Sequence, residues 1–429
     1  MPANASDELL QMTGPGQPAL VGAGTAARAV KICAVLIGLA IVVRLAIAAL
    51  SMGTNDAVAF TYFAGEVTVD GVTSTYQIDP RFNHPPLVGL WAGWVLRLVR
   101  ALPLKGWDVY KFAFIFRLPV IAADALGAWL LWRIWLPRIG PAKAAAIAAG
   151  FAWSLDAILV SGFHCNTDPI YVALCLLAVY LMEDRRAFLW AGLALGAAVN
   201  VKLIAVLLIA PLLLSCRTRQ EARALVFGLA LGVVPFLPAL SYAAPSFVRD
   251  ALSYNSGVNR WGITYFLLLG KETPDWNATA GGAAAWCHGN GRYLLFALIA
   301  LWAAAARRWP RWDRYEIAAV TLALFLVFTP GFGVQYTVAV GLLMFAVRPR
   351  LATAYAAASG LFLLQVYLNR RVPNIFPPIA VFDGAVSSAE AALGSVAWGI
   401  VVYFLLATVL PRSSASRVER APMSALGSV

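Results

Sequence analysis

One acidic residue follows directly on the first apolar run of the sequence. Asp56 ends the segment Ser-Met-Gly-Thr-Asn-Asp, which begins at Ser51. A carboxylate at a membrane surface can take the proton from a hydroxyl group as its oxygen attacks a carbon, which is general-base catalysis. The position also suits a helix cap, because Asn and Asp are favoured where helices begin. Asp56 is therefore a candidate catalytic base, and capping is the alternative.

Two histidines lie in short, constrained segments. His84 precedes two prolines and an apolar run, and Pro86 suits the first position of a helix, so the imidazole is held in place. His164 shares a tight connection with Asn166 and Asp168, and Asp168 stands before a proline as an N-cap would. These side chains are candidates for binding a substrate, and ordinary helix starts are the alternative.

Three further residues could meet an anionic or hydroxylated ligand. Lys202 stands alone between two apolar runs, where it must either extend to the membrane surface or bind an anion such as a phosphate. Gln335 follows the glycines of Gly-Phe-Gly and can donate to a sugar hydroxyl or face water. Arg260 lies in a long loop and is a candidate helper for a phosphate.

The composition shows which kind of structure must position these residues. Of 429 residues, 61% are hydrophobic and 13% are charged, with a mean hydropathy of +0.75. A soluble domain of this length needs more charge on its surface, so the composition predicts an all-α polytopic membrane protein. The net charge of +12 comes from short clusters between apolar runs, which is typical of topology signals and argues against a nucleic-acid partner.

Basic residues in the short loops define the topology. If residues 87–103 lie along the membrane surface rather than crossing it, the basic clusters all fall on one side, and the short loops 162–168 and 330–333 on the other side carry none. About twelve transmembrane helices follow from the remaining apolar stretches. These stretches lie near 32–50, 112–132, 143–161, 169–182, 187–199, 203–215, 224–242, 292–306, 315–329, 334–347, 351–368 and 391–410.

This topology divides the chain into one membrane domain and two tails. Residues 28–411 form the domain, with long outer loops at 51–111 and 243–291, and interfacial helices are expected in the first loop. Residues 1–27 and 412–429 are predicted to be disordered cytoplasmic tails. The stretches 187–199 and 203–215 are short for full crossings and predict a hairpin of half-length helices around Lys202.

The candidate residues then all reach the outer side, from loops that are far apart in sequence. Polar groups that converge at one mouth of an apolar bundle are the expected form of a site. The alternative is that outer loops are polar simply because they meet water. Cys165 and Cys287 also lie on this side, and the sequence leaves open whether they pair.

In order and spacing, these motifs resemble the GT-C superfamily of membrane glycosyltransferases over roughly residues 30–345. The resemblance is greatest to the glucosyltransferases of the N-glycan pathway that use a lipid-phosphate glucose donor. Their acidic residue in the first outer loop corresponds to Asp56, and their Tyr-Pro-Pro-Leu to the segment that begins at His84. Their Gly-His-Phe-Gln-Tyr-Asn turn is similar to residues 162–166, and their Asn-x-Lys-Gln to residues 200–203.

The sequence departs from that family at several positions. His84 replaces a Tyr, and Leu203 replaces a Gln. Asp168 is an acid that the glucosyltransferases lack, and it resembles instead the Asp-x-Asp turn of the metal-dependent oligosaccharyltransferases. The first Asp of that turn is Asn166 here, so a metal site does not follow from the resemblance.

These observations lead to the hypothesis that a hexose is transferred, without a cofactor, from a polyprenyl-phosphate sugar to a lipid- or glycan-linked hydroxyl on the outer face. Whether the sugar is mannose or glucose, and which acceptor receives it, does not follow from the resemblance. Direct displacement with one base predicts inversion at the anomeric carbon. Asp56 is then the base, and Lys202, His84 and Arg260 bind the donor phosphate. The remaining candidates, His164, Asn166, Asp168 and Gln335, shape the sugar pocket.

Two alternatives remain. One is a lipid-linked-sugar flippase or small-solute transporter, and the other is a metal-dependent transferase with Asp56 and Asp168 as ligands of a divalent cation. The excess of Arg over Lys, with many Ala, is typical of high-GC bacteria and favours an inner membrane, with the active site facing the periplasm.

Overall fold

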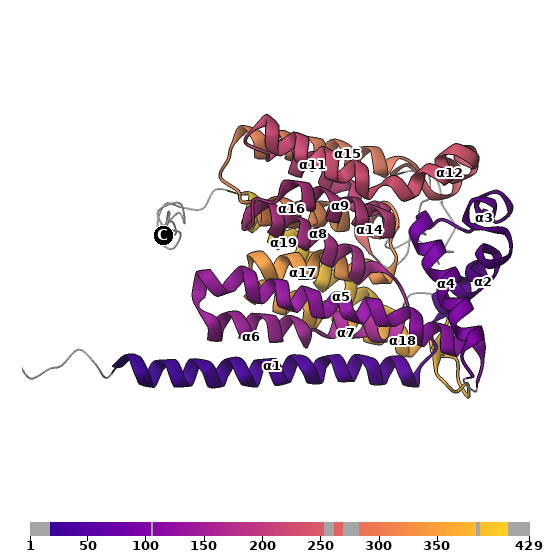
Figure 1. Ribbon diagram of the computed structural model, residues 1–429, viewed down its shortest axis with the longest axis horizontal. Helices are drawn as coiled ribbons and strands as arrows, with labels where there is room; N and C mark the ends of the chain where they lie inside the picture. Colours follow the sequence, from indigo (N-terminus) through magenta and orange to yellow (C-terminus); the bar gives the residue numbers. More distant parts are fainter. Residues whose placement is uncertain (1–17, 104–105, 253–260, 269–282, 383–386, 411–429) are drawn as a thin grey trace, which may run out of the picture.

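The computed structural model describes residues 18–103, 106–252, 261–268, 283–382 and 387–410. The long helices lie side by side along the longest axis of the molecule, and a group of shorter helices that includes α2, α3 and α4 covers one end of this bundle (Figure 1). The long helices are α1 (Pro18–Leu50), α5 (Asp108–Ile139), α15 (Ala283–Arg308), α18 (Pro349–Asn369) and α19 (Ser388–Val409).

Shorter elements fill the rest of the fold. Within the bundle they are α6 (Pro141–Ala152), α7 (Leu155–Leu159), η1 (Val160–His164), α8 (Asp168–Glu183), α9 (Phe188–Val201), η2 (Leu203–Leu208), α10 (Ile209–Leu214), α11 (Arg219–Gly232), α16 (Arg314–Phe328), η5 (Val334–Thr337) and α17 (Val338–Val347). The others are β1 (Gly53–Thr54), α2 (Asn55–Asp70), α3 (Val72–Ile78), α4 (Pro86–Ala101), η3 (Val234–Phe236), α12 (Leu237–Tyr242), α13 (Ala244–Phe247), η4 (Val248–Leu252), α14 (Gly262–Leu268) and β2 (Ile379–Ala380).

Five helices in the described part of the chain are long and apolar enough to cross a membrane, or seven if two bent helix pairs each count as one span. The fold is therefore an all-α polytopic membrane protein, but the predicted count of about twelve spans is not confirmed. Several predicted segments form helices too short to cross alone, such as α8 and α16. Residues 203–215 are divided between η2 and α10.

The basic loops gather at one end of the bundle, here called the basic end. Arg314 contacts Glu183 at the end of α8, and Arg311 and Arg348 donate to carbonyl groups in the last turn of α19. The end group of α2, α3 and α4 lies at the opposite end, here called the site end (Figure 1). The basic loops and the group of α2, α3 and α4 thus lie at opposite ends, which agrees with the predicted gathering of the basic clusters on one side of the membrane.

Helix α4 lies where an interfacial helix was predicted. Pro86 begins it, and its 16 residues are fewer than a full membrane crossing needs. One face, with Val88 and Val95, is buried, while Leu90 and Trp94 on the other are exposed. An exposed apolar face on a helix at the end of a bundle suits the boundary between lipid and water.

The pair α9 and α11 packs with its backbones in direct contact. A Cβ atom added at Gly192 would lie 2.1 Å from the Leu225 carbonyl oxygen, and one at Gly228 would lie 2.0 Å from that of Leu189. Each helix has a second glycine four residues later, Gly196 in α9 and Gly232 in α11, and glycines with this spacing allow close helix contact within membranes. The chain leaves α9 at Lys202, so the predicted break between two short helices is present, and its position relative to α11 is tightly defined.

The connection between α1 and α2 requires a glycine. Gly53 has a φ of +94°, and a Cβ there would lie 2.3 Å from the Phe163 carbonyl oxygen. β1 pairs in parallel with β2, which joins this connection to residues near the start of α19. Helix α1 begins at Pro18, which suits a first helical turn and precedes an alanine-rich run. Cys165 and Cys287 are not joined by a disulfide.

Candidate active site

A cavity of about 930 Å³ opens at the site end, between α2, the segment before α4, η2, α15 and η5. Apolar side chains from η2 and α15 form much of its wall, among them Leu203, Leu207 and Leu295. The polar residues that line it are Asn55, Asp56, Arg81, Asn83, His84, Asn166, Lys202, Arg292, Thr329 and Gln335. Five of the residues predicted from the sequence therefore meet in one cavity.

Asp56 lies in the first turn of α2, with its side chain 27% exposed. Thr54, not Asp56, caps the helix: its hydroxyl accepts from the Asp56 backbone N–H and donates to the His164 carbonyl oxygen at 2.7 Å. Capping is therefore not the role of the Asp56 carboxylate. The cap and this second bond together join the start of α2 to the connection that carries His164 and Asn166.

Two side chains hold the Asp56 carboxylate. Its Oδ2 accepts from Asn166 Nδ2 at 2.6 Å and lies 3.2 Å from His164 Nε2. The Tyr367 hydroxyl lies 2.7 Å from His164 Nδ1 and holds the ring so that Nε2 faces the carboxylate, which can only accept. Burial alone would raise the pKa of Asp56, but the hydrogen bonds and charge of His164, the Asn166 amide and the charge of Lys202 bring it below its usual value. Asp56 is thus ionised at neutral pH.

Lys202 reaches the cavity from the break between α9 and η2. Its Nζ donates to Asp168 Oδ2 at 2.9 Å and to Asn166 Oδ1 at 3.3 Å, and it lies 5.4 Å from the centre of the Tyr336 ring. The Lys202 side chain is 12% exposed, whereas Asp168 is fully buried behind it and does not line the cavity. Asn166 therefore joins Asp56 to Lys202 through the two ends of its amide.

His84 also lines the cavity, with its ring 4.6 Å from the Phe60 ring. The Tyr76 hydroxyl donates to the His84 carbonyl oxygen and fixes the backbone before α4. Burial, together with the charge of Lys202, lowers the pKa of His84 to about 3, although the Asp56 charge opposes this shift. The imidazole is therefore neutral and can offer one N–H donor, but no positive charge.

The remaining predicted residues divide into two groups. Gln335 lies in η5 and lines the cavity, whereas Arg260 lies outside the described residues. Two arginines that were not selected from the sequence also line the cavity. One is Arg81, which forms a two-point pair with Asp79, and the other is Arg292 in α15.

Two residues that sequence reasoning missed position the connection around His164. The buried Arg117 side chain donates to the carbonyl oxygens of Gly162 at 2.6 Å and Ser51 at 2.7 Å, which joins the end of α1 to residues 162–163. Tyr367, in α18, orients His164 as described above. A single arginine inside an apolar helix was the available signal for Arg117, because such a charge must have partners. No local pattern marks Tyr367.

The donor set between the two acids differs from that of a typical metal site. The Asn166 amide and the Lys202 ammonium group lie between Asp56 and Asp168. Lys202 therefore already neutralises the charge of Asp168. Among the described residues, no group of three or more His, Cys, Asp or Glu side chains is placed to hold a metal ion. The arrangement offers a carboxylate that can accept a proton and, in the same cavity, an ammonium group that can bind an anion.

The sequence from residue 102 to 330 matches glycosyltransferase family 87, which is more than half of the chain. The matched range includes Arg117, the connection around His164, and Lys202, whereas Asp56 and His84 precede it. No curated protein matches the sequence. The predicted resemblance to membrane glycosyltransferases of the GT-C type is supported, and the resemblance to the N-glycan pathway enzymes stays a prediction. The chain belongs to glycosyltransferase family 87.

Proposed function

We propose that the protein transfers a hexose from a polyprenyl-phosphate sugar to a hydroxyl group of a lipid- or glycan-linked acceptor, at the periplasmic face of a bacterial inner membrane. One observation supports this most: an ionised carboxylate and an ammonium group face the same cavity and share one amide, Asn166. Sugar transfer from a phosphate needs these two groups, a base for the acceptor and a cation for the leaving group.

In the proposed reaction, Asp56 takes the proton of the acceptor hydroxyl as its oxygen forms a bond to the anomeric carbon. The bond from that carbon to the donor phosphate oxygen breaks, and its electron pair stays on the phosphate. A single displacement inverts the anomeric configuration. Asp56 suits this role because it is ionised and is oriented by His164 and Asn166.

The leaving phosphate gains negative charge, which Lys202 stabilises. His84 adds a neutral N–H donor, and Arg81 and Arg292 supply further positive charge at the cavity wall. Arg260 keeps its proposed role in phosphate binding, from outside the described residues. Gln335 and Asn166 are proposed to contact the sugar, while His164 and Asp168 act through Asp56 and Lys202 rather than by lining the pocket.

The apolar wall suits the polyprenyl chain of the donor. Leu203, Val206 and Leu207 of η2 line the cavity directly after Lys202, and Leu295 and Phe296 of α15 line it beside Arg292. A phosphate that contacts Lys202 therefore has apolar side chains next to it, into which an isoprenoid chain can extend.

The test uses the purified protein in lipid vesicles, with a panel of polyprenyl-phosphate sugars and a lipid-extract acceptor. We expect Asp56→Asn to lower transfer by about 10²- to 10⁴-fold while donor binding persists. Asp70→Asn is the matched control, because Asp70 is an exposed acid at the other end of α2. Full activity of Asp56→Asn rejects the base.

Two further outcomes would reject other parts of the proposal. If the wild type uses only nucleotide sugars, the donor class is wrong. If strong chelation abolishes transfer and a divalent cation restores it, the metal-dependent alternative replaces the proposed one.

A further inference from the structure

A second cavity, of about 690 Å³, lies at the basic end between α10, α11 and the last turn of α15. It is far along the bundle from the large cavity, and none of its lining residues has a part in the proposed transfer. Four arginines line it: Arg217, Arg219, Arg223 and Arg307. Four guanidinium groups around one space create a positive potential that attracts anions.

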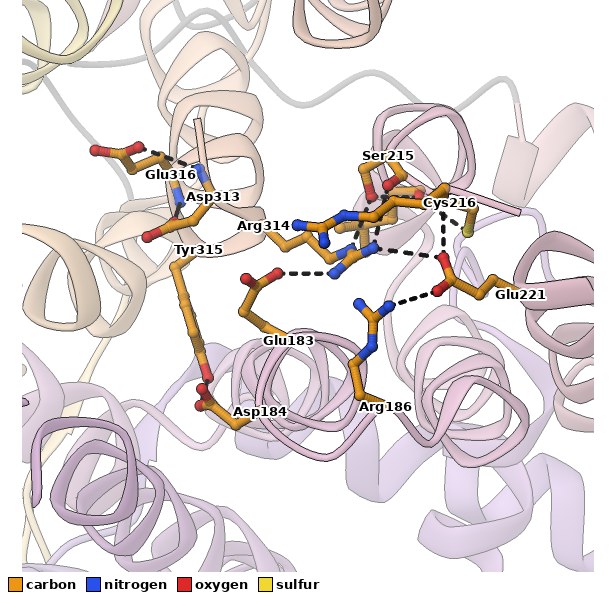
Figure 2. Close-up of polar contacts among 12 residues, drawn as sticks. Glu183, Asp184, Arg186, Ser215, Cys216, Glu221, Asp313, Arg314, Tyr315 and Glu316 are labelled. Atoms are coloured by element: carbon orange, nitrogen blue, oxygen red, sulfur yellow. Dashed lines mark hydrogen bonds and ion pairs between the residues drawn. The ribbon is translucent and has the colours of Figure 1, made fainter. Parts of the chain in front are cut away.

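The protein itself supplies little negative charge here. Glu221 is the acid of this segment, and it already lies 2.7 Å from Arg186 and 3.7 Å from Arg314 (Figure 2). It also accepts a hydrogen bond from the Arg217 backbone N–H at 2.8 Å. Within the described part of the chain, the side chains of Arg219 and Arg223 form no ion pair. The cavity therefore has an excess of positive charge.

The last of the four arginines has a structural role as well. One guanidinium nitrogen of Arg307 donates to the Cys216 carbonyl oxygen at 2.9 Å and to that of Leu214 at 3.4 Å, which ties the end of α15 to the end of α10. Its remaining donors, like those of Arg219 and Arg223, are available to a ligand. The cavity thus has a fixed cation on one wall and two exposed cations on the other.

An apolar surface continues from the arginines along the bundle. Leu214, Val226 and Phe227 line the same cavity and are 41%, 47% and 60% exposed. Arg219 and Arg223 are four residues apart on α11, and Val226 and Phe227 follow one turn further on, so charge and apolar surface share one face of the helix. This order, cations at the end of the bundle and apolar side chains along it, matches a lipid in the adjacent leaflet.

We propose that this cavity binds an anionic phospholipid of the membrane. The headgroup phosphate contacts Arg219, Arg223 and Arg307, and the acyl chains lie along Leu214, Val226 and Phe227. Basic pockets between membrane helices on this side of a bilayer are suited to such headgroups. Because α11 packs directly on α9, a bound lipid would stabilise the helix pair that leads to Lys202.

The experiment uses the full-length purified protein in detergent, with phosphatidylglycerol or phosphatidylcholine added. Retained lipid is counted by native mass spectrometry, and the melting temperature is followed in parallel. We expect phosphatidylglycerol to be retained and to raise the melting temperature more than phosphatidylcholine. The double variant Arg219→Gln/Arg223→Gln should weaken the retention of phosphatidylglycerol by roughly tenfold or more. The control variant Arg185→Gln/Arg350→Gln removes two exposed charges outside the cavity and should retain this lipid as the wild type does.

A second variant separates a lipid from a free anion. Phe227→Ala should weaken phosphatidylglycerol retention but leave the binding of glycerol phosphate unchanged. The proposal is overturned if the control pair loses as much lipid as the cavity pair, if phosphatidylcholine is retained equally, or if Phe227→Ala has no effect on lipid. Preferential retention of a polyprenyl phosphate over phosphatidylglycerol would also overturn it, because the occupant would then be another lipid.

Discussion

Helix α8 carries an acid at each end, and the two acids have different surroundings. At the site end, Asp168 pairs with Lys202, which also faces the large cavity. At the basic end, Glu183 pairs with Arg314, whose other donors go to the Ser215 carbonyl and hydroxyl oxygens (Figure 2). Both clusters hold charge out of water, but Lys202 of the first lines a cavity, whereas Glu183, Arg314 and Ser215 line neither of the two cavities described above. A dense polar cluster therefore indicates structure, and polar groups at a cavity indicate a site.

Among changes to these two ion pairs, the largest effect is expected at the site end, from Lys202→Met. Loss of the ammonium should lower transfer by roughly 10²- to 10³-fold, as expected for a lost transition-state donor. It also leaves the buried Asp168 carboxylate without its cation, which should lower the free energy of unfolding by roughly 3–5 kcal/mol. Transfer assays and thermal unfolding measure the two effects separately.

The double variant Lys202→Met/Asp168→Asn is the control for that experiment. It removes both charges, so stability should return towards that of the wild type while activity stays low. Recovery of transfer in the double variant would contradict the phosphate-binding role, because Lys202 would then serve only to neutralise Asp168.

A smaller effect is expected from His164→Gln, which acts through Asp56. The hydrogen bond and charge of His164 lower the pKa of Asp56, so their loss should raise it. Asp56 must be ionised to act as a base, so activity is lost as the pH falls through the pKa of Asp56. Because that pKa is higher in His164→Gln, the acid limb of its pH profile should move to higher pH. The maximal rate should fall by about tenfold with little change in KM. The control is His288→Gln, in α15 outside the cavity lining, which should leave the pH profile unchanged. An unshifted acid limb in His164→Gln would contradict the role of His164 in positioning Asp56.

The smallest effect on catalysis is expected at the basic end, from Arg314→Met. Arg314 is 4% exposed, and its loss leaves Glu183 without its cation, so the melting temperature should fall clearly. Transfer per folded molecule should change less than about twofold, because no group here reaches the large cavity. Arg308→Met, at an exposed arginine in the last turn of α15, should affect neither quantity. Lost transfer without lost stability would show that the basic end takes part in the reaction.

The sequence predicted the residues at the cavity better than the helices that hold them. Asp56 and His84 stood out because they border apolar runs, and Lys202 because it interrupts one. The charge distribution assigned all three to one end of the bundle. The number of spans could not be obtained in this way, since an apolar run has the same composition whether it forms one helix or, as at residues 203–215, two short ones.

Contacts between residues far apart in the chain could not be predicted from the sequence either. Tyr367 meets His164 across 203 residues of sequence, and nothing near either residue indicates the other. The spacing of the two pairs of glycines in α9 and α11 is a signal for close helix packing, but it does not show which helices pack together. The sequence marks Asp168 as an unusual acid in a short connection, but its burial behind Lys202 depends on packing that the sequence does not show.

The amide of Asn166 has a consequence for how this site could have evolved. Asn and Asp codons differ by a single nucleotide, so an Asp-x-Asp turn is one mutation away. That mutation would place a second carboxylate where the Asn166 nitrogen now lies, 2.6 Å from Asp56 Oδ2, and the two like charges would repel. A protein that uses Lys202 in this site therefore needs a further change among the partners of Asp56 before position 166 can carry Asp. The lysine-containing site and a site with an Asp-x-Asp turn are thus more than one mutation apart.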